Sequence, residues 1–278
     1  MERAGSLAVT TVDFPLEIAG AVAGPATAAS GHATTVQPNV FVIPAYNEEL
    51  NLPRLFDDLE SRPALFPPGS RVIIVDDGSE DRTAPIVADY AGDLPLELLS
   101  LGENQGPGAA FRAGFAAALA HCPDDAFVVT LEADTTSDLD ALPKMLERAA
   151  AGAELVLASW KMQNVSRRRR FLSAAAGFVV RHALGVNAKT VSSFFRVYRA
   201  RTLRTAMERY GDGFVRERGF ACKAEILANI ARLGAKIEEV QVDLDWSRRE
   251  GESKMPVVKT MVAYWRMLAR QSFVRESA

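Results

Sequence analysis

The chain has 278 residues, 48% of them hydrophobic, and a formal net charge of −3. This length and composition predict one catalytic α/β domain with a sizeable core, and the charge balance gives no support to nucleic-acid binding. The two cysteines, Cys122 and Cys222, lack the spacing of a disulfide framework or a zinc site, which favours a reducing, cytoplasmic compartment.

Residues 1–38 are expected to form a flexible leader. The stretch from Ala19 to Val36 is mostly Ala, Gly, Thr and Val, without a helical or strand period. Asp13, Pro15 and Glu17 interrupt the pattern of a signal peptide. Because no apolar run reaches the ~18 to 20 residues that span a bilayer, the chain is not expected to cross a membrane.

Strand and helix signals alternate from Asn39 onward. This alternation predicts an α/β fold with a mostly parallel central sheet and helices on both faces, and later elements are expected to join the same sheet. The expected strands are Val40–Ile43, Val72–Val75, Leu96–Leu99 and Ala126–Leu131, and the expected helices are Glu48–Leu59, Asp81–Tyr90 and Gly108–Ala120.

Two aspartates, Asp76 and Asp77, close the apolar run Arg71–Val75 and precede Gly78. Carboxylates at the carboxyl end of a buried strand stand where an open parallel sheet binds its ligand. The alternative is a pair of solvated loop carboxylates. Ser79 is expected to be the N-cap of the next helix.

Three segments carry a family resemblance. Pro44-Ala-Tyr-Asn-Glu48, Val75-Asp-Asp-Gly-Ser79 and Glu132-Ala-Asp134 resemble the family 2 inverting glycosyltransferases of the GT-A (Rossmann-like) fold. Arg248-Arg-Glu-Gly-Glu-Ser-Lys254 is similar to the RxxGxSK segment of the dolichol-phosphate mannosyltransferase and polyprenyl-phosphate glycosyltransferase branch. The resemblance implies a GT-A domain at residues 39–255, followed by a C-terminal amphipathic helix and tail at residues 256–278.

The resemblance also implies where the nucleotide binds. Asn104–Arg112 resembles the N-x-G-x-x-x-A-x-x-x-G helix start, in which Gly106 and Gly108 let the backbone pass close to the nucleotide. Glycines that serve only a turn are the alternative. The implied contacts to base and ribose come from residues after the first two strands: Pro44, Tyr46, Glu48, Asp76 and Asp77.

Glu132, Ala133 and Asp134 correspond to the DxD element, whose carboxylates hold Mg²⁺ or Mn²⁺ on the diphosphate of the donor. Ala133 falls within the implied donor site. Because Glu132 is one methylene longer than Asp, Asp134 is the better candidate for a catalytic metal ligand. An ordinary acidic loop is the alternative.

The second half departs further from the family pattern. Ser192-Ser-Phe-Phe-Arg-Val-Tyr198 resembles D-x-T-S-G-F-R, with Thr190 in place of Asp and Phe194 in place of Gly. Arg196 matches the family Arg and is a candidate acceptor or phosphate ligand, unless it is a structural cation. A bulky Phe in place of Gly changes the shape of the acceptor or sugar pocket.

Cations on the Gly-containing loop before residue 255 suit phosphate binding. Guanidinium binds phosphate oxygens bidentately and Lys acts as a point charge. Arg248, Ser253 and Lys254 are therefore predicted to bind phosphate, with Arg248 also a catalytic candidate. A solvated basic turn is the alternative.

The residues near Glu225 bear on the acceptor. Gly219–Glu225 resembles G-F-x-F-Q-x-E, which makes Glu225 a candidate pocket carboxylate and catalytic base, or a capping or salt-bridging group. Family members that act on hydroxyls place a Glu-Asp pair where this chain has Glu217-Arg218. A lipid phosphate, with a second pKa of about 6, needs no general base. The missing pair favours a phosphate acceptor.

Basic clusters beside apolar helices suit an anionic bilayer surface. Arg167–Arg170 precede one such helix, and a second is expected at Val257–Leu268, with Lys259, Arg266 and Arg270 near one face. Two interpretations of these helices are open. They attach the protein peripherally to the cytoplasmic face of the membrane, or they are ordinary core helices.

Together these features predict a metal-dependent, inverting glycosyltransferase. The favoured reaction moves mannose from GDP-mannose to a polyprenyl or dolichyl phosphate, and a UDP-sugar donor is open. One alternative is a family 2 enzyme that acts on a hydroxyl of a soluble metabolite or natural product. Another is a sugar-nucleotide-binding module that has lost turnover, suggested by Glu132, Thr190 and Phe194.

Overall fold

A computed structural model describes residues 37–160, 188, 190–191, 193–242, 260 and 262–267. In this part of the chain, seven strands form one sheet in the order β3-β2-β1-β4-β6-β5-β7. Of these strands, β6 alone runs antiparallel to its neighbours, β4 and β5. The strands are β1 Asn39–Ala45, β2 Arg71–Asp76, β3 Leu96–Ser100, β4 Phe127–Thr130, β5 Leu155–Trp160, β6 Arg196–Arg199 and β7 Ile237–Val242.

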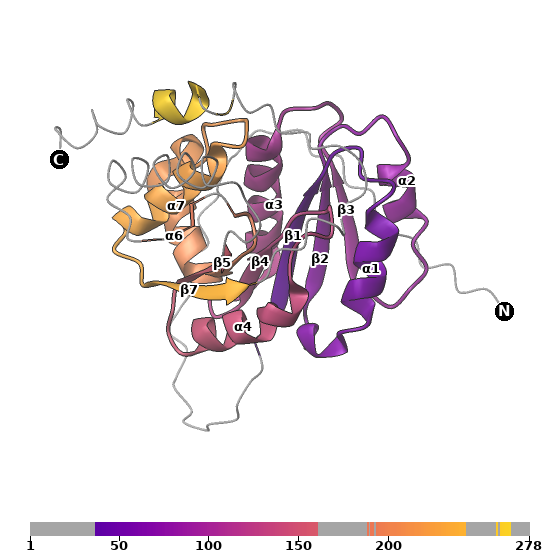
Figure 1. The fold of residues 1–278 in the computed structure, drawn as a ribbon, viewed down its shortest axis with the longest axis horizontal. Helices are drawn as coiled ribbons and strands as arrows, with labels where there is room; N and C mark the ends of the chain where they lie inside the picture. Colours follow the sequence, from indigo (N-terminus) through magenta and orange to yellow (C-terminus); the bar gives the residue numbers. More distant parts are fainter. Residues whose placement is uncertain are drawn as a thin grey trace, which may run out of the picture.

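Helices cover both faces of the sheet (Figure 1). Alternate residues of β1 enter two different cores. Val40 and Val42 face α3, α6 and α7, whereas Phe41 and Ile43 face α1, α2 and α4. The helices are α1 Leu52–Glu60, α2 Thr83–Ala88, α3 Pro107–His121, α4 Leu142–Ala150, α6 Ala200–Tyr210 and α7 Cys222–Arg232, with short 3₁₀ turns η1 Pro63–Leu65, η2 Leu139–Ala141 and η3 Gly211–Gly213. The predicted α/β fold is confirmed.

Two helix starts were predicted too early. The helix expected from Glu48 begins at Leu52, because the N–H groups of Asn51 and Leu52 both donate to the Glu48 carbonyl and close a turn there. The helix expected from Asp81 begins at Thr83 with Arg82 in the N-cap position, so the prediction that Ser79 caps it is wrong.

The C-terminal helix is described at residues 260 and 262–267, which agrees with the helix expected there. It lies beside the α6 and α7 part of the molecule (Figure 1). Tyr264 and Met267 pack against the core, whereas Val262 and Trp265 are exposed. No helix within the described ranges is both long and apolar enough to span a membrane.

Candidate functional site

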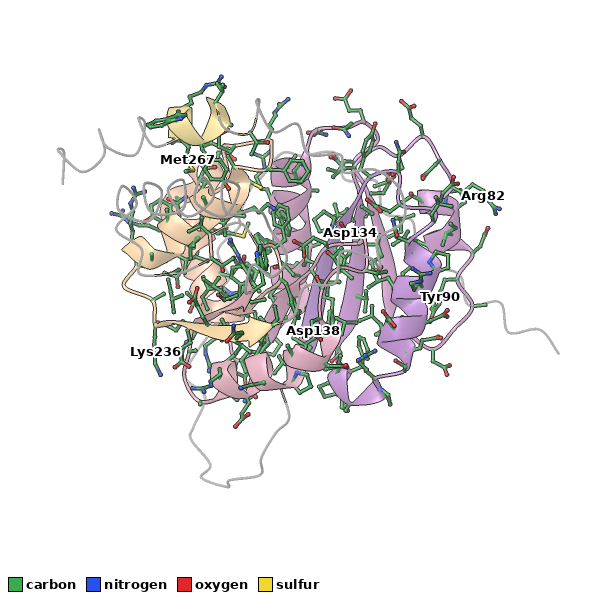
Figure 2. All side chains as sticks on the ribbon, in the orientation of Figure 1. Arg82, Tyr90, Asp134, Asp138, Lys236 and Met267 are labelled. Atoms are coloured by element: carbon green, nitrogen blue, oxygen red, sulfur yellow. The ribbon has the colours of Figure 1, made fainter. Side chains whose placement is uncertain are left out.

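The predicted acidic residues follow neighbouring strands that run in the same direction. Strand β1 pairs in parallel with β2 through Ala45 and Asp76, and with β4 through Val42 and Thr130. The turn after β1, the aspartates after β2 and the Glu132 to Asp134 segment after β4 therefore gather at one edge of the sheet. Asp134 lies near the middle of the molecule in Figure 2.

Asp76 ties the loop that follows β2 to the end of β3. Its carboxylate accepts the Ser79 N–H at 3.0 Å and the Ser100 hydroxyl at 3.3 Å. The Ser79 hydroxyl oxygen accepts the Asn47 N–H at 2.9 Å. Ser79 therefore joins the loops that follow β1 and β2 instead of capping α2.

Asp77 holds the loop that leads into α3. One carboxylate oxygen accepts the Gln105 N–H and the other accepts the Gly106 N–H, each at 2.8 Å. Burial raises the pKa of Asp77 and the neighbouring Asp76 charge adds to this effect, while the two N–H donors oppose it. These contacts fix the backbone at the start of α3.

Gly106 and Gly108 allow two backbone segments to approach closely. Gly106 has a φ of +91°, and a Cβ on it would lie 2.5 Å from the Arg218 carbonyl oxygen. A Cβ on Gly108 would lie 1.9 Å from the Glu217 carbonyl oxygen, and the Gly108 N–H donates to Arg218 at 2.8 Å. The contacts favour the structural alternative for these glycines.

The turn after β1 is held from two sides. Pro44 and Tyr46 are half-buried. The Glu48 N–H donates to the Thr83 hydroxyl at 2.7 Å, and the Glu48 carboxylate accepts the Asn51 side-chain amide at 2.7 Å. The turn is thus fixed at the edge where the aspartates of β2 end.

The carboxylates of the acidic segment after β4 accept hydrogen bonds from side chains and from the backbone. Glu132 accepts the Phe194 N–H on one oxygen at 3.1 Å and the Ser137 hydroxyl on the other at 2.9 Å. The Asp134 Oδ1 accepts the Thr136 hydroxyl at 2.7 Å. Ala133 is buried in the core between them. Both carboxylates are therefore oriented by their neighbours.

The carboxylate oxygens of Glu132 and Asp134 are suitable ligands for a hard divalent cation. Carboxylate oxygens are the ligands that Mg²⁺ and Mn²⁺ prefer, and two of them leave coordination positions for a diphosphate and water. In the described residues no group of three or more His, Cys, Asp or Glu side chains is placed to hold a metal. A cation held by Glu132 and Asp134 would take its remaining ligands from other groups.

Arg196 lies on β6 and is buried, with 1% of its surface exposed. Its guanidinium donates to the carbonyls of Lys223 at 2.9 Å and Val191 at 3.2 Å. These contacts tie β6 to the start of α7 and favour the structural-cation alternative.

Glu225 lies in the first turn of α7 and organises the loop before it. Its Oε2 accepts the N–H groups of Arg216 at 2.8 Å and Glu217 at 2.7 Å. Burial raises its pKa to about 7, although the backbone hydrogen bond from Arg216 and the charge of that residue oppose the shift. The carboxylate thereby fixes the loop that packs on Gly106 and Gly108.

Sequence reasoning missed Lys223, which lies two residues before Glu225. Its ammonium is 4.1 Å from the centroid of the Phe194 ring and 5.3 Å from that of Phe220. Burial lowers the pKa of Lys223, and the nearby Glu132 and Asp134 charges oppose the shift. A lysine among the small and apolar residues Ala221, Cys222 and Ala224 was the signal that could have identified it.

Several predicted residues lie outside the described ranges. Arg248, Ser253 and Lys254 of the basic loop, the basic cluster Arg167–Arg170 and the leader before residue 37 belong to this group.

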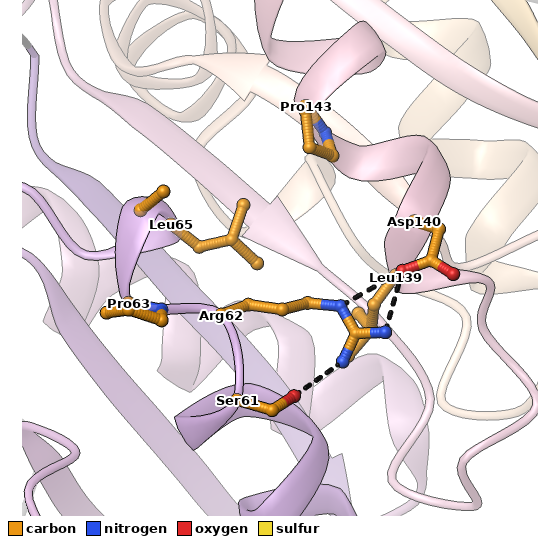
Figure 3. Close-up of a pocket in the computed structure, with 8 residues that line it drawn as sticks. Ser61, Arg62, Pro63, Leu65, Leu139, Asp140 and Pro143 are labelled. Atoms are coloured by element: carbon orange, nitrogen blue, oxygen red, sulfur yellow. Dashed lines mark hydrogen bonds and ion pairs between the residues drawn. The ribbon is translucent and has the colours of Figure 1, made fainter.

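A separate pocket lies between the end of α1 and the start of α4 (Figure 3). Residues 61–65 line it together with Leu139, Asp140 and Pro143. Arg62 and Asp140 form an ion pair across it at 2.7 Å. No described residue of the predicted site lines this pocket, so it is distinct from the strand-end site.

Comparison with known proteins identifies a family and several relatives. The model of glycosyl transferase family 2 matches residues 40–209. The chain is 34% identical over 224 residues to an undecaprenyl-phosphate mannosyltransferase of Micrococcus luteus, covering 77% of this chain and 86% of the relative. It is 32% identical over 168 residues to an undecaprenyl-phosphate 4-deoxy-4-formamido-L-arabinose transferase of Pseudomonas fluorescens, covering 60% of this chain and 48% of that relative. The chain thus spans about half the length of the second relative.

Solved structures share the GT-A fold. A glucosyl-3-phosphoglycerate synthase of Mycobacterium tuberculosis in complex with phosphoglyceric acid superposes with a TM-score of 0.60 at 18% identity, covering 84% of this chain and 80% of the other. A mannosyl-3-phosphoglycerate synthase of Rubrobacter xylanophilus gives 0.57 at 16% identity, covering 87% and 76%. The Mycobacterium enzyme also has a structure with Mn²⁺ and uridine diphosphate. At these identities the likeness concerns the fold alone.

Proposed function

The chain belongs to glycosyl transferase family 2, and we propose that this glycosyltransferase moves a sugar from a nucleoside-diphosphate sugar to a polyprenyl phosphate. The observation that carries the proposal is the strand-end cluster of Asp76, Glu132 and Asp134 in a chain 34% identical to an undecaprenyl-phosphate mannosyltransferase. GDP-mannose is the favoured donor, since that relative is named for mannosyl transfer.

In the proposed reaction, Asp76 binds the base of the donor. Pro44, Tyr46 and Glu48 line the nucleotide from the turn after β1. Mg²⁺ or Mn²⁺ held by Asp134 and Glu132 would neutralise the charge that grows on the departing diphosphate. Asp77 acts at a distance, because its two hydrogen bonds hold the loop before α3 in place.

The acceptor phosphate attacks the anomeric carbon while the bond from that carbon to the diphosphate breaks. Attack opposite the leaving group inverts the configuration of that carbon. We assign Arg248, Ser253 and Lys254 to the acceptor phosphate, where cations and a hydroxyl offset its charge. Arg196 is left out of this contact, since backbone carbonyls accept its hydrogen bonds.

The surroundings of Glu225 support a phosphate acceptor. A hydroxyl acceptor needs a general base, whereas an ionised phosphate does not. The Glu225 Oε2 is committed to two backbone N–H groups, and the Glu217-Arg218 segment packs with its carbonyls against the start of α3. Both observations favour a loop-holding role over proton transfer.

The C-terminal helix supports attachment to the membrane that carries a lipid acceptor. Tyr264 and Met267 face the core, while Val262, Trp265 and Arg266 are exposed on the other side. An aromatic ring beside a cation suits the headgroup region of an anionic bilayer. We propose peripheral binding at the cytoplasmic face through this helix.

Transfer assays that combine each of several sugar donors with each of several acceptors test the proposal. GDP-mannose, UDP-glucose and UDP-N-acetylglucosamine are each offered with undecaprenyl phosphate or with hydroxyl acceptors, with Mg²⁺ or Mn²⁺ present, and products are separated by chromatography. We expect transfer to the lipid phosphate, with GDP-mannose the best donor. Product only with hydroxyl acceptors would contradict the acceptor assignment, and metal-dependent nucleotide binding without any product would identify a binding module.

A matched pair of variants tests the β4 site in the same assay. Asp134→Asn removes a metal ligand and should lower the rate by roughly 100-fold, as loss of one preorganised electrostatic contact does. The control is Asp140→Asn, an exposed carboxylate that pairs with Arg62 in the separate pocket. Equal rates in the two variants would exclude Asp134 from the reaction.

A further inference from the structure

Three departures from the family pattern, far apart in the sequence, form one cluster. Glu132 takes the place of Asp in DxD, Phe194 that of Gly in D-x-T-S-G-F-R, and Lys223 that of Gln in G-F-x-F-Q-x-E. The Glu132 carboxylate accepts the Phe194 N–H at 3.1 Å. The Lys223 ammonium lies 4.1 Å from the centroid of the Phe194 ring. The three substitutions therefore make a single packed unit.

The surroundings of Lys223 act on its charge in both directions: burial and the nearby Arg196 charge lower its pKa, whereas its aromatic and acidic neighbours favour the ammonium form. Only 9% of its surface is exposed, and removing an ammonium from water is costly without compensation. The faces of Phe194 and Phe220 attract the cation. Glu132 and Asp134 attract it as well, from the end of β4. The cluster thus places the Lys223 ammonium near the carboxylates of the candidate metal site, and these carboxylates favour its charged form.

A positive charge at this position favours binding of a diphosphate. The diphosphate of a sugar nucleotide is an anion, and Glu132 and Asp134 would repel it. A divalent cation relieves that repulsion in the proposed reaction, but its charge is present only while it is bound. Lys223 belongs to the chain, and Lys acts on phosphate as a point charge.

Building on the function proposed above, we propose that the Lys223 ammonium binds the diphosphate of the donor beside Asp134 and supplies part of the positive charge that a divalent cation supplies there. Two consequences follow with opposite signs. Replacing Lys223 by a neutral residue weakens diphosphate binding without metal. It also tightens Mn²⁺ binding, because a like charge beside the carboxylates is gone.

Calorimetric titrations in EDTA test the first consequence, with GDP, UDP, GMP and UMP as probes. Lys223→Gln restores the residue type of the family pattern, and Lys223→Met keeps the length of the side chain without its charge. Both should weaken diphosphate binding about tenfold, the loss typical of one charge-assisted hydrogen bond, and leave monophosphate binding unchanged. Titration with Mn²⁺ tests the second and should show tighter binding.

The control is Lys236→Gln, which removes an equal charge elsewhere. Lys236 is exposed, pairs with Glu238 at 2.9 Å and lies at the edge of the molecule, away from Asp134, in Figure 2. We expect no change in any titration. Thermal unfolding of each variant shows whether the fold is kept.

The wild-type protein gives a test that needs no variant. In EDTA it should bind GDP or UDP about tenfold more tightly than the matching monophosphate. Equal affinity for the two would overturn the proposal for Lys223, as would diphosphate and Mn²⁺ affinities that fall together in Lys223→Gln. Absence of nucleotide binding to the wild type, with and without Mn²⁺, would overturn the proposed function itself.

Discussion

The two ends of the candidate site are held in different ways. At the end of β2, Asp76 and Asp77 accept hydrogen bonds chiefly from backbone N–H groups, those of Ser79 and of Gln105 and Gly106 before α3. At the end of β4, Glu132 accepts from a residue 62 positions away in the chain, and Lys223 of α7 lies beside it. The first end is fixed chiefly by backbone donors of the loops around it, whereas the second depends on the packing of side chains from β4, α7 and the segment before β6.

Asp77→Asn tests the backbone-held end and should have the largest effect on stability. Asn has nearly the volume of Asp, but its NH₂ group replaces one carboxylate oxygen. This NH₂ group cannot accept a hydrogen bond from the N–H of Gln105 or Gly106 that it faces. Loss of a buried, charge-assisted hydrogen bond should lower the free energy of unfolding by about 2–3 kcal/mol, measured by denaturant titration.

The exposed Asp93 is the matched control, and Asp93→Asn should leave the free energy of unfolding nearly unchanged. If Asp77→Asn instead keeps full stability and weakens nucleotide binding, Asp77 belongs to the nucleotide contact that the family resemblance implied.

The sequence was informative where local pattern decides the structure. Apolar runs followed by turns predicted the positions of β1, β2 and β3, and the acidic residues after β2 and β4 fell at one edge of the sheet. The role of Ser79 was mistaken, because its hydroxyl oxygen accepts an N–H of the previous loop instead of capping its own helix. A bond between two loops leaves no periodic signal.

Contacts at the second end were beyond such reasoning. The sequence allowed Arg196 to be either a phosphate ligand or a structural cation. Its guanidinium donates to the carbonyls of residues 191 and 223, which favours the structural role. Lys223 was passed over for the same reason, since nothing near it in sequence is acidic apart from Glu225. The carboxylates that attract its charge, Glu132 and Asp134, lie in the segment after β4.

Glu225→Gln tests how the loop before α7 depends on pH. Because burial raises the pKa of Glu225 to about 7 from an ordinary 4.5, the folded state holds a proton that the unfolded state releases between these values. The resulting stability is present at low pH and is lost as the pH rises through 7. From pH 5 to pH 8 the wild type should lose about 2 kcal/mol of unfolding free energy that Glu225→Gln does not lose.

The amide oxygen of Gln can still accept both N–H groups, since both bonds reach the single Oε2 atom. Glu147→Gln, at an exposed position of α4, is the control and should follow the wild-type profile. A wild-type profile that runs parallel to that of Glu225→Gln would show that the carboxyl is already ionised when folded.

The smallest expected effect concerns the exposed side of the C-terminal helix. Trp265 is 63% exposed on the C-terminal helix, whose other side packs on the core through Tyr264 and Met267. Trp265→Ala should lower binding to vesicles that contain anionic lipid about fivefold, which corresponds to about 1 kcal/mol of lost apolar burial. Leu50 is similarly exposed at 61% near α1, so Leu50→Ala is the control and should bind as the wild type does. Equal losses in both variants, measured by co-sedimentation, would mean that exposed apolar residues bind lipid wherever they lie and that the C-terminal helix has no special part in it.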